Sequence, residues 1–320
     1  MTTTAIPEGA RNGTGIPASA RWSRMIGTLA GILLGLVLLA SAWTKGVDPA
    51  GFAEQIVRLG LLPPGLATWG GILVIGLEAA LGLALVAGLR RPPILVAVTL
   101  MMAGFVAITA WEFVHPLEDY SSCGCFGNLV QRTPGQALAE DIGFLVLAGL
   151  SWLGRPTRPA RLRWALVPAG FAAGVALALL APSLPLDDLA TRLRPGTTVA
   201  SLRLDEIIPE LQEGTHLVLL LDRADETTRA EIPRVNEHLA LVGGPVDVFG
   251  LAEENEELEV EFLWTAGPAF DVRGAPWSLL KPLYRKLPRS FLVRDGVVVR
   301  VWNGIPPDED LDRLASGKVP

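Results

Sequence analysis

The sequence predicts an α-helical multi-pass membrane domain followed by an α/β domain. Half of the 320 residues are hydrophobic and only 19% are charged, whereas soluble domains carry about 25% charged residues. Residues 1–186 hold most of the apolar runs and carry 9 acidic and 12 basic side chains, while residues 187–320 carry 24 acidic and 15 basic ones. Two regions in different solvents are therefore expected, and the acidic second region, which has no basic stripe, excludes nucleic acid as a partner.

Five apolar runs have about the 20 residues that a helix needs to cross hydrocarbon about 30 Å thick. They cover residues 25–43, 66–87, 93–111, 137–153 and 162–180. The small residues Ala40, Ser41 and Ala42 resemble a signal-peptidase site, so cleavage is the alternative for the first run. That run is long for a signal segment and four more follow, which favours five spans.

Arginine positions predict how the spans are oriented. Arginines precede the first run, separate the second from the third, and separate the fourth from the fifth: Arg11, Arg21, Arg24, Arg90, Arg91, Arg155, Arg158, Arg161 and Arg163. The opposite loops carry only Lys45, Arg58 and Arg132. In a cell (inner or plasma) membrane, the N-terminal tail 1–21 would be cytoplasmic. The loop after the third span and residues 187–320 would be extracytoplasmic.

The only two cysteines, Cys123 and Cys125, flank a glycine in that extracytoplasmic loop, where disulfides persist. A disulfide requires Cα atoms about 4.4–6.8 Å apart, so a Cys-Gly-Cys ring is strained, and strained exposed disulfides are labile. So short a ring removes little unfolded-state entropy and stabilises poorly. The pair is predicted to be catalytic in thiol-disulfide exchange; a structural bridge and a metal site are the alternatives.

A metal site would need further ligands, and the nearby candidates are His115, Glu118 and Asp119. Their spacing matches no zinc motif, so no metal is predicted. His115 could assist deprotonation of a thiol. The plainer interpretation is a solvated surface histidine.

Two charged residues in or near the spans are candidate supporting residues. Glu78 lies in the middle of the second run, where an unpaired carboxylate is costly, so a functional role is the default interpretation. An interhelical packing hydrogen bond is the alternative. Lys45 ends the first run and would be an ordinary interfacial anchor unless it extends inward to Glu78 or a helix tilts. Glu140 and Asp141, at the start of the fourth run, are interpreted as interfacial.

The C-terminal region alternates strand and helix patterns, which predicts a layered sheet. Strands are expected at 199–204, 216–222, 246–251, 289–294 and 297–302, and helices at 227–241, 253–262, 277–286 and from about 308. Asp295-Gly296 between two apolar runs predicts a hairpin.

The string Cys123-Gly-Cys125-Phe126-Gly127, with Ser41-Ala-Trp-Thr-Lys45 and Leu77-Glu78, resembles the MauE (methylamine-utilisation) family within the DoxX-like membrane proteins. The resemblance covers about residues 22–153. It implies a four-helix core, so that 154–186 hold a basic loop and a fifth span. It also implies a role in forming or maintaining disulfides in a periplasmic client protein that has cysteines.

Residues 287–304 resemble the closing half of thioredoxin-like domains, in which a cis-proline precedes an antiparallel hairpin. The resemblance extends over roughly 196–316 within an extracytoplasmic domain of residues 187–320, and it implies that Pro288 is the cis-proline. Polar residues from Asp225 to Thr228 occupy the usual Cys-x-x-Cys position, and this region has no cysteine. A docking or substrate-holding module is therefore expected, with a vestigial domain as the alternative.

Together these patterns predict a membrane thiol-disulfide oxidoreductase or redox maturation factor. A redox partner protein or, by analogy with other membrane disulfide systems, a quinone would carry the electrons onward. Two other classes stay open: a non-enzymatic assembly scaffold with a structural disulfide, and a small-solute transporter that uses Glu78.

Overall fold

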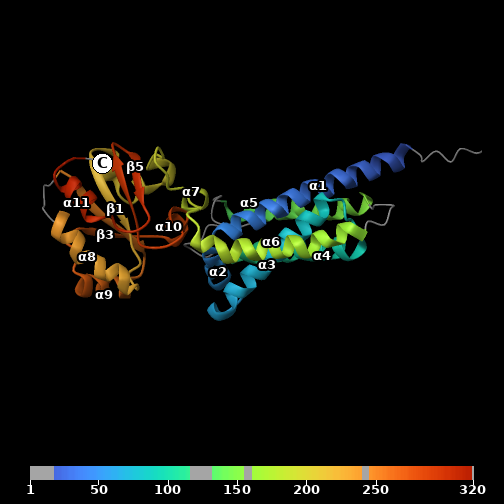
Figure 1. The fold of residues 1–320 in the computed structure, drawn as a ribbon, viewed down its shortest axis with the longest axis horizontal. Coiled ribbons are helices and arrows are strands. Elements are labelled where there is room, and N and C mark those ends of the chain that lie inside the picture. Colours follow the sequence, from blue (N-terminus) through green and yellow to red (C-terminus); the bar gives the residue numbers. More distant parts are fainter. Residues whose placement is uncertain (1–17, 116–131, 155–160, 240–244, 319–320) are drawn as a thin grey trace, which may run out of the picture.

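The computed structural model describes residues 18–115, 132–154, 161–239 and 245–318. It consists of a bundle of long apolar helices and an α/β domain, which lie one after the other along the long axis of the molecule (Figure 1).

The bundle contains five helical segments that are long and apolar enough to cross a membrane: Arg21–Val47, Pro64–Val86, Pro92–Val114, Pro134–Gly154 and Arg163–Ser183. They contain helices α1 (Ala18–Val47), α3 (Pro64–Val86), α4 (Pro92–Val114), α5 (Pro134–Ser151) and α6 (Leu166–Leu180). The five expected spans are thereby confirmed, each within a few residues. Proline begins α3, α4 and α5, a position that tolerates its missing N–H.

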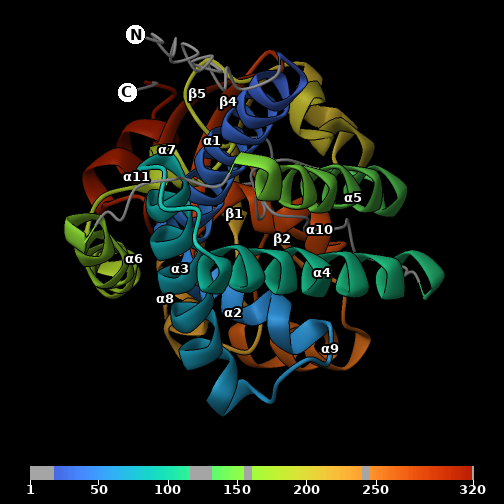
Figure 2. The same ribbon diagram turned by 90° about the vertical axis from the view of Figure 1, so that its right-hand side faces the viewer.

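Helix pairs α1–α3, α3–α6 and α4–α5 form the main contacts of the bundle, and α4 lies beside α5 in the end view (Figure 2). Glycine permits the closest of these approaches. A Cβ atom on Gly35 of α1 would lie 2.8 Å from the carbonyl oxygen of Gly82 on α3. Leu34, Leu38 and Leu85 fill the apolar core on either side.

A short helix, α2 (Pro49–Arg58), joins α1 to α3 at the end of the bundle nearest the α/β domain (Figure 1). Asp48 caps it by accepting a hydrogen bond from the Gly51 amide. Because the chain reverses between spans, α4 ends and α5 begins at this same end. We call it the domain-facing end, marked by Val47, Pro64, Val114 and Pro134.

The α/β domain, from α7 (Asp187–Ala190) onward, has a five-stranded sheet in the order β3-β2-β1-β4-β5. The strands are β1 (Thr215–Leu220), β2 (Asp247–Glu253), β3 (Asp271–Ala275), β4 (Arg289–Arg294) and β5 (Val297–Trp302). β1, β2 and β3 are parallel, while β4 runs antiparallel to β1 and pairs with β5 as the predicted hairpin.

The sheet separates two apolar layers, because side chains along a strand alternate between its faces. Leu217 and Leu219 point into the layer formed with α8 (Glu226–Leu239), α9 (Glu256–Ala266) and α11 (Asp308–Ala315). Val218 and Leu220 point into the other layer, together with Phe291.

Two expectations for this domain were wrong, and one strand was missed. Residues 199–204 form the short 3-10 helices Ala200–Leu202 and Leu204–Glu206 instead of a strand, because Arg203 has a left-handed backbone with φ 59°. The helix expected at 277–286 is only α10 (Trp277–Leu280) followed by a 3-10 turn, where Pro282 has no N–H to continue it. Strand β3 was not expected.

Candidate functional site at the domain-facing end

Cys123 and Cys125 lie outside the described residues, as do Glu118 and Asp119. The chain nevertheless fixes where their segment is attached. It leaves α4 after His115 and returns before Arg132, so both attachment points are at the domain-facing end.

His115 is the last described residue before that segment. Its ring stacks on Trp111, with ring centroids 4.0 Å apart, and its Nδ1 lies 3.2 Å from the Trp111 carbonyl oxygen. The side chain is exposed. These contacts hold the imidazole against the last turn of α4.

A buried ion pair joins α1 to α3 close to the domain-facing end. Lys45 Nζ lies 2.5 Å from Glu78 Oε1, and the two side chains are 3% and 0% exposed. Ser41 completes the cluster: its hydroxyl donates to Glu78 Oε1 at 2.9 Å and accepts from Lys45 Nζ at 3.0 Å. The rings of Phe52 and Phe105 surround the ammonium at 5.1 and 4.7 Å from their centroids.

The structure explains why Lys45 meets Glu78 directly, although Glu78 is in the middle of its apolar run. The first turns of α3 pack against α2 through Ala67, Ala53 and Ile56. They therefore extend past the end of α1, and Glu78 lies level with Ser41. Ser41 and Lys45 are one turn apart on α1 and share a face.

This cluster retains one free acceptor. Among the described residues, Glu78 Oε2 is buried and has no hydrogen-bond partner. A carboxylate in hydrocarbon that is paired on one oxygen only is typical of a functional position. The site can bind a further hydrogen-bond donor or hold a proton.

Two more carboxylates are buried nearer the cysteine segment. Glu112 of α4 is 4% exposed and Asp141 of α5 is 2% exposed. Glu112 lies on the same helix face as Phe105, about 10 Å further toward the domain-facing end at 1.5 Å per residue. Sequence reasoning did not single out Glu112 and assigned Asp141 only an interfacial role. Their helical spacing from the partly buried Phe105 and the buried Ala137 was the available signal.

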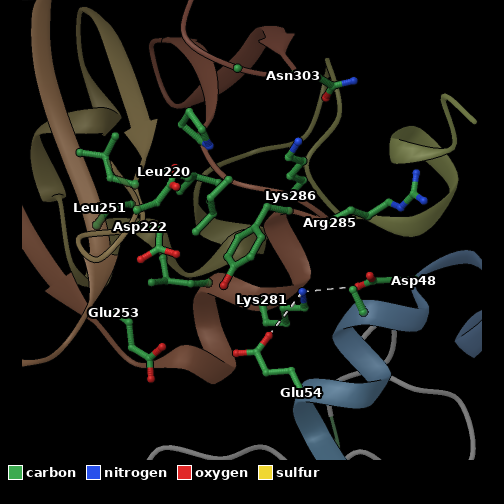
Figure 3. Close-up of a pocket in the computed structure, with 18 of the residues that line it drawn as sticks. Asp48, Glu54, Leu220, Asp222, Leu251, Glu253, Lys281, Arg285, Lys286 and Asn303 are labelled. Atoms are coloured by element: carbon green, nitrogen blue, oxygen red, sulfur yellow. Dashed lines mark ion pairs between the residues drawn. The ribbon is translucent and has the colours of Figure 1, made fainter. Parts of the chain in front are cut away.

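A pocket of about 1110 Å³ lies between the bundle and the α/β domain (Figure 3). Asp48 and Glu54 of α2 form one wall, and Asp222, Glu253 and Lys281 of the α/β domain lie opposite. We call it the two-domain pocket. Residues 48–54 on one wall are at least 168 residues away in sequence from Asp222, Glu253 and Lys281 on the other.

The two-domain pocket includes the position at which thioredoxin-like domains carry their dithiol. Pro288, preceded by a cis peptide bond, lines it. So does Asp225, which follows β1 and accepts a hydrogen bond from the Thr228 amide at the start of α8. That backbone hydrogen bond lowers the pKa of Asp225. Residues 187–320 contain no cysteine, so this edge of the sheet can bind a ligand but has no thiol.

Polar contacts fasten α2 to the α/β domain beside the pocket. The Trp277 indole N–H donates to Glu54 at 2.6 Å, and Arg58 donates to both carboxylate oxygens of Glu253 at 2.8 and 2.7 Å. The Arg58 guanidinium also lies 4.6 Å from the Trp277 ring centroid. Lys281 Nζ also lies between carboxylate oxygens of Asp48 and Glu54.

Tyr284 lies among these charges on the pocket wall. Burial of its hydroxyl raises the pKa of Tyr284, and the carboxylates of Glu54 and Glu253 raise it further. The phenol is therefore neutral wherever the domain is folded at ordinary pH, and it can donate a hydrogen bond into the pocket.

A family model matches the part of the chain that holds the first four spans. Residues 23–154 match the family model described as methylamine utilisation protein MauE. Protein TlpB of Flavobacterium psychrophilum is 25% identical over 194 residues, which is 60% of this chain and 50% of TlpB. The chain thus matches about half the length of that curated relative.

The solution structure of a putative protein disulfide isomerase from Bacteroides thetaiotaomicron matches 34% of this chain and 74% of its own chain, with 16% identity and a TM-score of 0.29. The order of the sheet, the helix after β1 and the cis-proline before β4 are the features of a thioredoxin-like domain. The chain therefore joins a membrane domain that matches the MauE family model over residues 23–154 to a C-terminal domain with a thioredoxin-like fold.

Proposed function

We propose that the protein is a membrane thiol-disulfide oxidoreductase in which Cys123 and Cys125 exchange a disulfide with an extracytoplasmic client protein. The observation that carries the proposal is the attachment of the cysteine segment. Both of its ends are at the domain-facing end, the end that also forms the two-domain pocket with Pro288. In this proposal the arginine-poor, domain-facing end lies outside the cell membrane, where disulfides persist.

The exchange proceeds through a mixed disulfide. The thiolate of one cysteine attacks a sulfur of the client disulfide, a protein-client S–S bond forms, and the other client sulfur leaves and takes up a proton. The second cysteine then loses its proton and attacks the mixed disulfide, which closes the Cys123–Cys125 bond and releases a dithiol client. The reverse sequence oxidises the client. Repeated turnover requires a further carrier of two electrons, of the protein or quinone class.

The described residues have supporting roles in this proposal. The thioredoxin-like domain, which lacks a dithiol, binds a client segment in the two-domain pocket, and the cysteine segment carries out the thiol-disulfide exchange. Lys45 and Glu78 hold the outer end of α1 against the middle of α3. In this proposal His115, the last described residue before the cysteine segment, accepts a thiol proton. A thiolate is the reactive species, so a nearby proton acceptor speeds the exchange.

The test is a single-turnover exchange assay with the full chain, reduced beforehand, in proteoliposomes and a model client that contains one disulfide. Cys123→Ser and Cys125→Ser should each abolish turnover, and one of them should accumulate a mixed disulfide that is visible on a non-reducing gel. Ser122→Ala changes a hydroxyl in the same segment and removes no thiol, so it should exchange at the wild-type rate. Turnover that survives the loss of either cysteine would refute the proposal.

A further inference from the structure

A second cavity, of about 520 Å³, lies between α2, α3 and α6. Apart from Glu54 and Thr68, all of its lining residues are apolar, and Ala53, Ala67 and Ala178 form its buried floor. Water in such a groove would lack the polar partners that it needs. An apolar occupant is therefore favoured.

The position of this apolar groove relative to the spans indicates where its occupant comes from. Ile72 belongs to the span Pro64–Val86, and Ala178 and Leu179 belong to the span Arg163–Ser183. Ala50 and Val57, on the other wall, belong to α2, which lies outside the spans. The groove thus extends from the hydrocarbon level to the domain-facing surface, and the solvent at its inner end is lipid.

At its outer end the groove adjoins the two-domain pocket, since Pro49, Ala50, Glu54 and Pro182 line both cavities. Charges of both signs meet there. Lys281 Nζ lies 3.6 Å from an Asp48 oxygen and 3.7 Å from a Glu54 oxygen (Figure 3). Both separations are longer than a hydrogen bond, and Glu54 also pairs with Arg58 at 3.0 Å. Lys281 is 3% exposed, whereas Asp48 is 15% and Glu54 is 36% exposed, so the two carboxylates are the groups that a ligand can reach.

We propose that the apolar groove binds a zwitterionic phospholipid from the leaflet nearer the thioredoxin-like domain. One acyl chain lies between α2, α3 and α6. The head group lies beside Glu54, with its ammonium toward the carboxylates of Asp48 and Glu54, which repel a net anionic head group. Bound there, the lipid contacts the helix that fastens the thioredoxin-like domain, so it stabilises the junction between the two parts. This inference does not depend on the cysteine chemistry.

The test is native mass spectrometry of the full chain, purified in detergent and then supplied with phosphatidylethanolamine or phosphatidylglycerol at equal concentration. We expect one retained phosphatidylethanolamine molecule, bound at least ~tenfold more tightly than phosphatidylglycerol, equivalent to about 1.4 kcal/mol. Ala50→Trp and Thr68→Trp each place an indole in the groove from an exposed position, and either should remove the retained lipid. Leu100→Trp, at a position of α4 that is 67% exposed and does not line the groove, should leave retention unchanged.

Two results would overturn the proposal. One is equal retention of the two lipids by the wild-type chain, because the head-group argument requires discrimination. The other is wild-type retention by Ala50→Trp and Thr68→Trp. Thermal unfolding of each variant shows that it is folded, and having two blocking positions keeps the test decisive if one variant does not fold.

Discussion

Removing either partner of the buried Lys45–Glu78 pair should destabilise the membrane domain far more than removing both. Lys45→Met leaves Glu78 without its cation, at 0% exposure and with only the Ser41 hydroxyl as a described partner. Breaking a buried ion pair by removing one partner costs about 3–5 kcal/mol, whereas an apolar replacement of the whole pair is often neutral or stabilising. Glu78→Met should behave like Lys45→Met, for the converse reason.

The double variant Lys45→Met/Glu78→Met removes both charges and retains similar side-chain volume. We expect it to be more stable than either single variant by at least about 2 kcal/mol, so that the effects of the two substitutions are far from additive. Chemical unfolding of the four proteins in the same detergent, followed by tryptophan fluorescence, measures the cycle. Additive effects of the two substitutions would refute the argument, because they would mean that the two charges do not stabilise each other.

Three further predictions concern the packing of the helices and the α/β domain. Arg58→Glu should weaken the contact between α2 and the α/β domain, which would be measured as faster amide hydrogen exchange in α10. Adding Glu253→Arg should restore the protection, because the pair is then present with its charges exchanged. A double variant without restored protection would contradict the described ion pair. Gly82→Leu should destabilise the bundle, because a Cβ atom there would lie 2.8 Å from the Gly35 carbonyl oxygen, whereas Gly104→Leu, with open space at its Cβ position, should not. Hydrogen bonds from Arg273 lower the pKa of Glu210 from 4.5 to about 2. A depressed folded-state pKa stabilises the fold above the unfolded pKa, and this stability is lost as pH falls from 4.5 toward 2. Arg273→Gln should therefore weaken the pH dependence of the free energy of unfolding between pH 4.5 and 2. An unchanged pH dependence would contradict the assignment.

The membrane domain was the most predictable part of the chain, for a simple physical reason. A span must be a continuous apolar segment of nearly fixed length, so composition alone locates it. The direct contact of Lys45 with Glu78 was less accessible, because it depends on how far α3 extends past the end of α1. That offset is set by the packing of Ala67 on α2, a tertiary contact without a local sequence signal.

In the α/β domain, strands with continuous apolar residues were located well, and β4 and β5 match their expected bounds. Strand β3 was not located. Its sequence Asp271-Val-Arg-Gly-Ala275 has a glycine where an alternating pattern needs an apolar residue. Its pairing with β2 at the edge of the sheet determines its conformation. The two-domain pocket could not be predicted at all, because Glu54 and Lys281 meet only through the docking of one part on the other.

The redox state and sidedness of the cysteine pair test the central claim most directly. The measurement is labelling of the two thiols in spheroplasts with a membrane-impermeant maleimide, with and without reductant, followed by titration against redox buffers of known potential. The proposed exchange predicts labelling from outside after reduction and a midpoint above roughly −300 mV, where labile disulfides lie. Labelling only after permeabilisation would contradict the proposed orientation, and a midpoint well below that value would identify the bond as structural.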